Sequence, residues 1–425
     1  MNDTSKQNAG TSSRAAELLA KLNSSRDASA DERARVEGHA RLVRAPGRVN
    51  LIGEYTDFNL GFVLPVAIDR EVWIAFEAWD RPDVELTSVE INETRSFTFD
   101  GLAPRAGGSA FWIDYVAGTA WAMSRAGLPL CGFRGVLNST IPVGAGLSSS
   151  AALEMAASLA LADPAALRPS AAAMAAIAQQ AENTYVGVNC GIMDQYASAA
   201  GREGHALLID CKINKATPAQ IPTNVSIVVC DTGSPHRLGS SAYNTRRSEC
   251  ELGARLIGER EPGVTSLRDV DEAMLARNRD RLPEVVARRC EHIVRENQRV
   301  MATVAALRDG DLEALGHLFA ASHASLRDLF EVSSPELDVM VEIATSVPGV
   351  VASRMTGGGF GGCTVNLVSH GAEEALREKV VRDYSTHTGL GPKVYTVAAV
   401  DGASEIQVGP GGRSTGASRA IVFDE

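Results

Sequence analysis

The segment from Pro142 to Glu154 constrains this chain more than any other part of its sequence. It reads PVGAGLSSSAALE and runs directly into an alanine-rich stretch that is typical of a helix. Glycines permit close backbone approach, and a helix N-terminus leaves unpaired N–H groups with a partial positive charge. That combination suits a phosphate group, although a serine turn that merely caps a helix would look the same. The segment lacks the Gly-Lys-Ser/Thr ending of a Walker A loop.

A second glycine cluster, Met355–Cys363, reads MTGGGFGGC and contains the pattern G-x-G-x-x-G. In a dinucleotide-binding fold this pattern stands between a strand and a helix. Here the next segment, Thr364–Val368, is strand-like. We therefore favour a glycine-rich turn between two strands, close to another backbone or to a ligand.

Two groups of acidic residues complete the set. Glu54 and Asp57 stand near Arg48 in the segment PGRVNLIGEYTDFN, and carboxylates are good acceptors for sugar hydroxyls. A solvated turn is the alternative for these charges. Asp194 stands among apolar residues in CGIMDQY, where a buried carboxylate would need a cation partner. From its local sequence alone, Asp194 is more readily interpreted as a helix cap than as a base.

The composition excludes several classes of protein. Hydrophobic residues make up 45% and charged residues 22% of the 425 residues, as in ordinary globular proteins. A net charge of −11 disfavours nucleic acid as a partner. Seven cysteines without a C-x-x-C pair disfavour a disulfide framework and a zinc site. The sequence shows neither a secretory signal nor a membrane-length apolar run, so we expect a cytoplasmic location and no membrane contact.

The strand and helix patterns are mixed without regular alternation, which indicates an α+β fold in two domains. We expect a partly disordered N-terminal extension over residues 1–38 and a first domain over 39–225. The second domain is expected over 226–403, followed by a flexible tail over 404–425.

In their order and spacing, these clusters resemble the galactokinases of the GHMP small-molecule kinase superfamily. Arg44–Arg70 is similar to the galactokinase signature, Gly144–Glu154 to the superfamily phosphate loop, and Met355–Cys363 to its third motif. Three further stretches fit galactokinases specifically: Ser241–Arg247, Glu291–Arg299 and His323–Asp338.

The resemblance implies a two-domain GHMP kinase with its active site in the interdomain cleft. The implied reaction transfers a phosphoryl group from ATP to the C1 hydroxyl of galactose, giving α-galactose 1-phosphate and ADP, with Mg²⁺ as the cofactor. The expected partners are the sugar and ATP, and the expected state is a monomer. Two alternatives stay open: a GHMP kinase for another galactose-like sugar such as N-acetylgalactosamine, and a non-catalytic sugar sensor.

The resemblance also implies roles for individual residues. Asp194 and Arg48 match the catalytic positions. The sugar-contact positions are matched by Glu54, Tyr55, Asp57, Gly191 and Tyr243. The nucleotide positions are matched by Trp112, Tyr115, Gly144, Gly146, Ser148, Ser149 and Ser150. Ser150 and Glu182 match the metal ligands.

Two positions depart from the galactokinase pattern. Tyr55 stands where these proteins usually carry His, and its larger ring could reshape the sugar pocket. Pro235 stands before His236, where the family often has a basic residue. Neither departure alters Arg48, Ser150 or Asp194.

Overall fold

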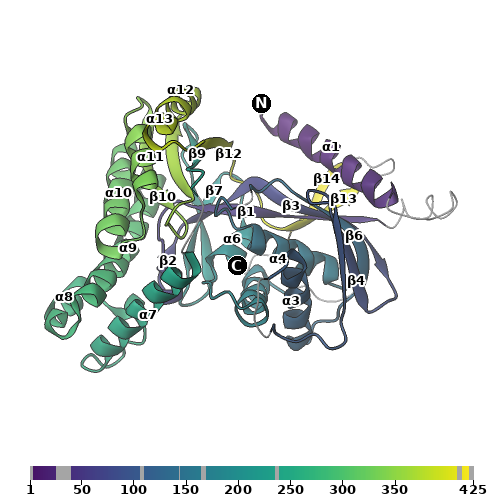
Figure 1. The fold of residues 1–425 in the computed structure, drawn as a ribbon, viewed down its shortest axis with the longest axis horizontal. Coiled ribbons are helices and arrows are strands. Elements are labelled where there is room, and N and C mark those ends of the chain that lie inside the picture. The colour runs from purple at the N-terminus through teal and green to yellow at the C-terminus, as the bar shows by residue number, and fades with distance from the viewer. Residues whose placement is uncertain are drawn as a thin grey trace.

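The computed structural model describes residues 3–24, 40–105, 110–142, 144–163, 169–234, 239–408 and 414–420. Helices and strands are mixed, with three sheets of seven, four and three strands, which confirms the α+β prediction. Figure 1 shows the seven-stranded sheet with its helices on one side of the molecule and the four-stranded sheet with the longer helices on the other.

The seven-stranded sheet forms the core of the first half. Its order is β14 (Ser414–Ala420), β13 (Ser404–Val408), β1 (Arg41–Asn50), β3 (Pro65–Trp79), β6 (Gly132–Ser139), β4 (Asp83–Ser88) and β5 (Glu93–Thr98). Among the described strands of this sheet, β4 and β6 are parallel neighbours and the other neighbours are antiparallel. One face packs on four helices, α3 (Trp112–Arg125), α4 (Ser149–Leu161), α5 (Ala171–Gln180) and α6 (Met193–Ala200). Successive residues of β3 alternate between the two faces, so Ile74 points to these helices and Trp73 points away.

Helix α1 (Asp3–Ser24) covers the opposite face of this sheet (Figure 1). Its residues Ala15, Leu18 and Leu22 are buried against Trp73. We expected residues 1–38 to form a partly disordered extension, and within it the structure describes residues 3–24 as a helix. The spacing of the three apolar residues places them on one helical face, which the sheet buries.

The second half is built on the four-stranded sheet. Its order is β10 (Val350–Thr356), β11 (Cys363–Ser369), β9 (Val225–Asp231) and β12 (Lys393–Val397), all antiparallel. The chain enters this sheet at β9, beside the boundary that we expected at 225/226. The remaining helices are α7 (Gly239–Gly258), α8 (Glu272–Arg277), α9 (Glu284–Asp309), α10 (Leu312–Ser325), α11 (Pro335–Thr345), α12 (Glu373–Lys379) and α13 (Ser385–Thr388).

A three-stranded sheet and several short turns complete the fold. The sheet consists of β2 (Phe62–Val63), β7 (His205–Asp210) and β8 (Lys215–Gln220). Helical turns are η1 (Asp57–Asn59), η2 (Ala181–Val186), η3 (Leu267–Asp269), η4 (Arg279–Arg281), η5 (Leu326–Phe330) and η6 (Val380–Tyr384). In the part of the chain that the structure describes, every helix is too short or too polar to cross a bilayer.

The C-terminal segment adds two strands to the seven-stranded sheet. We expected a flexible tail from 404 on, but β13 returns to the first sheet and pairs with β1, and β14 pairs with β13. Ile406 lies opposite Leu42 and is buried under α1. Arg41 on β1 and Glu405 on β13 form an ion pair with two hydrogen bonds. The exposed edge of β1 therefore gains hydrogen-bond partners from the end of the chain.

Candidate active site

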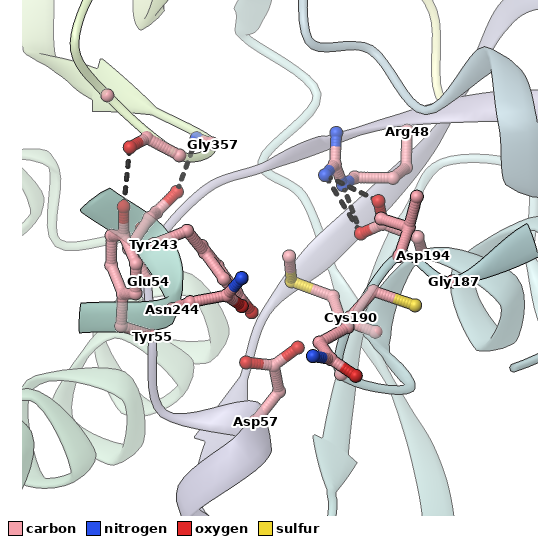
Figure 2. A pocket seen from close by; sticks show the side chains of 16 residues that line it. Arg48, Glu54, Tyr55, Asp57, Gly187, Cys190, Asp194, Tyr243, Asn244 and Gly357 are labelled. Carbon is pink, nitrogen blue, oxygen red and sulfur yellow. Dashed lines mark hydrogen bonds and ion pairs between the residues drawn. The ribbon is translucent and has the colours of Figure 1, made fainter. Parts of the chain in front are cut away.

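A cavity of about 390 Å³ opens where both halves of the chain meet. Four segments contribute most of its wall: the loop after β1, residues 187–194 before and in α6, the start of α7, and the turn between β10 and β11. We call residues 53–62 the signature loop and residues 357–362 the glycine turn. Figure 2 shows their side chains converging on one space.

Arg48 and Asp194 form the central ion pair of this cavity. Arg48 donates from Nε and Nη2 to the two carboxylate oxygens of Asp194 at 2.9 and 2.8 Å. Ser148 donates its hydroxyl to the same carboxylate at 2.5 Å, and Arg48 Nη1 donates to the carbonyl of Gly146 at 2.6 Å. Asp194 lies in the first turn of α6, but its side chain serves this pair instead of capping the helix. One guanidinium thus connects the carboxylate to the loop that precedes α4.

The described part of that loop, residues 144–148, presents the N-terminus of α4 beside the pair. Gly144, Gly146 and Ser148 all have positive φ, at 77°, 69° and 59°. Ser148 is the N-cap residue, yet its hydroxyl is bound to Asp194 and does not cap α4. The first N–H groups of a helix have no partner within the helix, and the side chain of the N-cap residue does not bind them here. Ser149 and Gly146 are exposed, so the end of α4 is open to an anion.

Two buried acidic side chains lie next to the start of α4. Gln195 Nε2 donates to Glu182 at 2.6 Å and to Glu154 at 3.1 Å, and Cys190 donates to Glu182 at 3.4 Å. Burial, with the nearby charge of Asp194, raises the pKa of Glu182 to about 7. Burial also raises the pKa of Glu154 well above its usual range. Among the described residues, neither carboxylate forms an ion pair with a Lys or Arg.

Glu182 also accepts a hydrogen bond from Ser150, which lowers its pKa in opposition to burial. A hydroxyl and an under-neutralised carboxylate at a helix N-terminus are hard oxygen donors that fit Mg²⁺. The described residues contain no cluster of three His, Cys, Asp or Glu side chains arranged around a metal position. Further ligands of such an ion would have to be other oxygens, such as those of a phosphate group.

The signature loop places two acidic residues on the cavity wall in different ways. Glu54 is 2% exposed, and protein groups occupy its carboxylate: it is paired with buried Arg354 and accepts the N–H of Gly357 at 3.1 Å. Asp57 points into the cavity (Figure 2), and burial and the charge of Asp194 raise its pKa to about 6. Asp57 is therefore the more available hydroxyl acceptor of the two.

Gly191 is required by the position of Asp57. A Cβ at residue 191 would lie 1.7 Å from Asp57 Oδ2, so any side chain would displace the carboxylate. Tyr55 and Tyr243 form the aromatic part of the wall, with ring centroids 5.3 Å apart. The Tyr55 hydroxyl donates to the carbonyl of Gly358.

Helix α9 holds the signature loop from behind, by contacts that involve the loop backbone. Glu296 accepts the N–H of Gly53 at 3.1 Å, and Asn297 accepts the N–H of Phe62 at 2.8 Å. His292 Nε2 lies 3.3 Å from the carbonyl of Glu54, which can only accept. Burial lowers the pKa of His292 to about 4, so its ring is neutral at physiological pH. These contacts give a positioning role to the stretch Glu291–Arg299.

Trp112 and Tyr115, predicted to border a nucleotide base, lie at the start of α3 outside the cavity wall. Trp112 is partly buried against the core of the first half, and its Nε1 donates to Glu93 at 3.0 Å. Burial and the charge of Glu182 raise the pKa of Tyr115 to about 12, so this phenol lies near the acidic pair.

The structure brings most of the predicted residues together. Seven of them line the cavity: Arg48, Glu54, Tyr55, Asp57, Gly191, Asp194 and Tyr243. Sequence reasoning assigned no role to residues 187–190, Asn244 or Arg354, and it missed the link between Ser148 and Asp194. The glycine turn joins two antiparallel strands, as predicted, and this excludes a dinucleotide fingerprint there. Pro235 and His236 lie outside the described residues.

Comparisons with known proteins identify the class of this architecture. The models for the N-terminal and C-terminal domains of GHMP kinases match residues 114–202 and 303–386. The mevalonate kinase of Methanococcus jannaschii shares the fold, with a TM-score of 0.59 at 16% identity over 86% of this chain and 99% of that one. The chain therefore has the GHMP kinase fold, as the sequence predicted.

Three further matches define the family. The model for the galactokinase galactose-binding signature matches residues 33–78. Galactokinases of Roseiflexus sp. (strain RS-1) and Chloroflexus aurantiacus are each 42% identical, covering 86% and 85% of this chain and 93% of each relative. The structure of Lactococcus lactis galactokinase complexed with galactose superposes with a TM-score of 0.82, at 32% identity over 88% of this chain and 97% of that one. The chain belongs to the galactokinase family.

Proposed function

We propose that this protein transfers the γ-phosphoryl group of ATP to the C1 hydroxyl of galactose, giving α-galactose 1-phosphate and ADP. The observation that carries the proposal is the position of Asp194. Its carboxylate is held by Arg48 and Ser148 between the cavity and the open N-terminus of α4. A hydroxyl in the cavity and a phosphate at α4 would therefore meet at this carboxylate.

The residues supply positioning and charge, which phosphoryl transfer mainly requires. The C1 oxygen forms a bond to the γ-phosphorus, the bond from that phosphorus to the β,γ-bridging oxygen breaks, and ADP leaves. Asp194 accepts the proton of the C1 hydroxyl. Arg48 orients Asp194 by its two hydrogen bonds and brings positive charge next to the transferring group. The backbone N–H groups of Ser149 and Ser150 stabilise the triphosphate charge.

Mg²⁺ would be held by Ser150 and Glu182, and it supplies neutralisation of the triphosphate charge. The fit rests on Glu182, a buried carboxylate that forms no ion pair among the described residues and faces the Ser150 hydroxyl. Gln195 fixes the orientation of Glu182 by donating one hydrogen bond to it and one to Glu154.

The sugar would be bound by the wall opposite Arg48. Asp57 offers its carboxylate to sugar hydroxyls, Gly191 leaves room for that carboxylate, and Tyr243 contributes a ring face. Glu54 contributes mainly by holding the glycine turn, because Arg354 and Gly357 already occupy its oxygens. Trp112 and Tyr115 would border the adenine from the start of α3. The monomeric state and the cytoplasmic location stay predictions.

ADP release with ATP, Mg²⁺ and a panel of free hexoses tests the proposal. We expect turnover with galactose that exceeds turnover with N-acetylgalactosamine and glucose. Turnover of N-acetylgalactosamine alone would preserve the kinase and refute the substrate. Sugar binding without ADP release from any hexose would indicate a sensor and refute catalysis.

A further inference from the structure

Tyr55 holds an unusual conformation for a large residue. Its φ is 67°, in the left-handed region that favours glycine, so this conformation costs free energy that its contacts must offset. The ring is 5% exposed and lies within an aromatic cluster. Ring centroids are 4.7 Å away for Phe330, 5.3 Å for Tyr243 and 6.2 Å for Phe58.

The hydroxyl of Tyr55 bridges the two halves of the chain. It donates to the carbonyl of Gly358, which is 303 residues further along and lies in the glycine turn. The preceding residue, Glu54, accepts the N–H of Gly357. Two adjacent residues of the signature loop thus hold two adjacent residues of the glycine turn, and Figure 2 shows both contacts at one side of the cavity.

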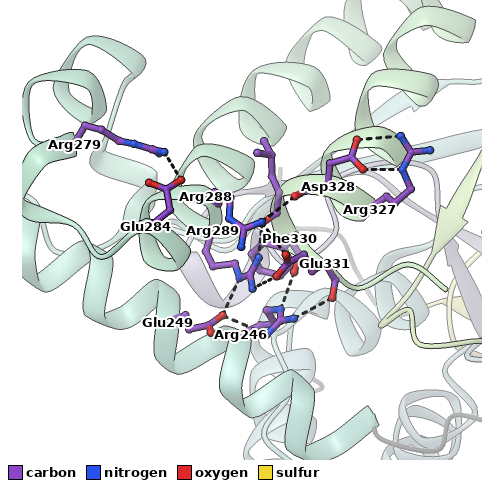
Figure 3. A network of polar contacts seen from close by, with 11 residues as sticks. Arg246, Glu249, Arg279, Glu284, Arg288, Arg289, Arg327, Asp328, Phe330 and Glu331 are labelled. Atoms are coloured by element: carbon purple, nitrogen blue, oxygen red, sulfur yellow. Dashed lines mark hydrogen bonds and ion pairs between the residues drawn. The ribbon is translucent and has the colours of Figure 1, made fainter.

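An arginine network fixes the other side of the aromatic cluster (Figure 3). Arg289 is 2% exposed and forms ion pairs with Glu249 and Glu331. It also donates a hydrogen bond to the carbonyl of Leu329 at 2.5 Å. Arg246 donates to the carbonyl of Phe330 at 2.7 Å. Arg246 lies on α7, one turn after Tyr243, so the same network holds the helix that carries Tyr243 and the segment that carries Phe330.

We propose that Tyr55 is a positioning residue that joins the signature loop to the glycine turn and does not read a sugar hydroxyl. This inference rests on the proposed function, because it concerns how two parts of the sugar cavity wall are held together. The phenol has one proton to donate, and that proton is bound to Gly358. Other polar side chains on the cavity wall, such as Asp57 and Asn244, recognise the individual hydroxyls of the sugar.

The test variant is Tyr55→Phe, which keeps the ring in the cluster and removes only the hydroxyl. We expect the galactose KM to rise about three- to tenfold, the effect of one neutral hydrogen bond. We expect kcat and the ATP KM to stay within about twofold of the wild-type values, which is less than the change expected for the galactose KM. The KM values for galactose and 2-deoxygalactose should rise by the same factor, because the contact that is lost is not with the sugar.

The matched control is Tyr384→Phe. Tyr384 is buried in the second half and outside the cavity wall, and its hydroxyl donates to the carbonyl of Thr232 at 3.1 Å. Thr232 donates to the carbonyl of Gly362, at the end of the glycine turn that lies away from Gly357 and Gly358. This variant should lose a comparable amount of stability in urea while leaving the galactose KM unchanged. A rise in KM in both variants would attribute the effect to general loosening and overturn the proposal.

Amide hydrogen exchange gives a readout that needs no activity. We expect faster exchange at residues 356–360 of Tyr55→Phe, which include Gly357 and Gly358, and unchanged exchange at these residues in Tyr384→Phe. Unchanged exchange in Tyr55→Phe would overturn the positioning role, and so would a change in the ratio between galactose and 2-deoxygalactose. Absence of galactose turnover in the wild-type protein would refute the proposed function separately, because the exchange result stands without it.

Discussion

Replacing Asp194 with Asn removes a negative charge from the centre of the site while keeping the shape of the side chain. In the wild-type protein Arg48 donates to both carboxylate oxygens, at 2.9 and 2.8 Å, and Ser148 donates to one of them. Asn offers a single acceptor oxygen, and its NH₂ group faces a donor. At least one charge-assisted hydrogen bond is lost, which costs about 1.5–3 kcal/mol of unfolding free energy.

The effect on activity should be larger than the effect on stability. The amide cannot accept the hydroxyl proton, and loss of a general base typically lowers turnover by about 10²–10⁴-fold. We expect Asp194→Asn to show a kcat reduced by that factor, measured as ADP release at saturating galactose and ATP. Urea unfolding should show a protein that still folds cooperatively, with its free energy of unfolding lowered by about 2 kcal/mol.

Asp210→Asn is the matched control for this variant. Asp210 is paired with Arg268 at 2.8 Å, and their side chains are 20% and 18% exposed, close to the 25% and 8% of Asp194 and Arg48. Asp210→Asn removes the same charge outside the cavity, so its kcat should stay within about twofold of the wild-type value. That change is far smaller than the loss expected when a general base is removed. A kcat of Asp194→Asn within about threefold of wild type would refute the assignment of the base.

Three further changes test other parts of the site. Burial raises the pKa of Asp57 to about 6, so the folded protein binds the proton of this carboxyl more tightly than the unfolded chain does. The stability that this proton contributes to the folded state is therefore lost as the pH rises from about 4 to 6. Asp57→Asn should therefore gain up to about 3 kcal/mol relative to wild type over that range in urea titrations, and parallel pH profiles would contradict this. Gly191→Ala should raise the galactose KM by up to about 100-fold, because the new Cβ would displace the Asp57 carboxylate. The control Gly391→Ala should leave the KM unchanged, because a Cβ there meets nothing within 4 Å. Equal KM values in the two variants would contradict the argument that a side chain at residue 191 displaces Asp57. Glu182→Gln should raise the Mg²⁺ concentration for half-maximal ADP release by about tenfold or more, and an unchanged Mg²⁺ dependence would exclude it as a ligand.

Local patterns in the sequence predict the parts of the site that are local in the chain. The phosphate loop depends on positive φ at Gly144 and Gly146 and on the helix that follows directly. The glycine turn depends on strands on both of its sides. Periodicity and glycine spacing record such features within a few residues, so both were predictable before the fold was known.

Contacts between distant segments could not be predicted in the same way. Ser148 and Asp194 are 46 residues apart, and Arg354 lies about 300 residues after Glu54. The α9 residues that hold the signature loop bind backbone atoms, which have the same chemistry at every position. The C-terminal strand β13 is five residues long, a Gly/Ser-rich segment follows it, and its partner β1 lies about 360 residues earlier in the sequence.

The most direct test of the central claim is the chemical identity of the product. ³¹P and ¹H NMR of a reaction with galactose, ATP and Mg²⁺ would show which oxygen carries the phosphoryl group. Membership of the galactokinase family, together with the position of Asp194 between the cavity and α4, predicts α-galactose 1-phosphate in amounts equal to the ADP released. Phosphate at another hydroxyl, or ADP matched only by inorganic phosphate, would contradict the claim that Asp194 and Arg48 direct transfer to C1.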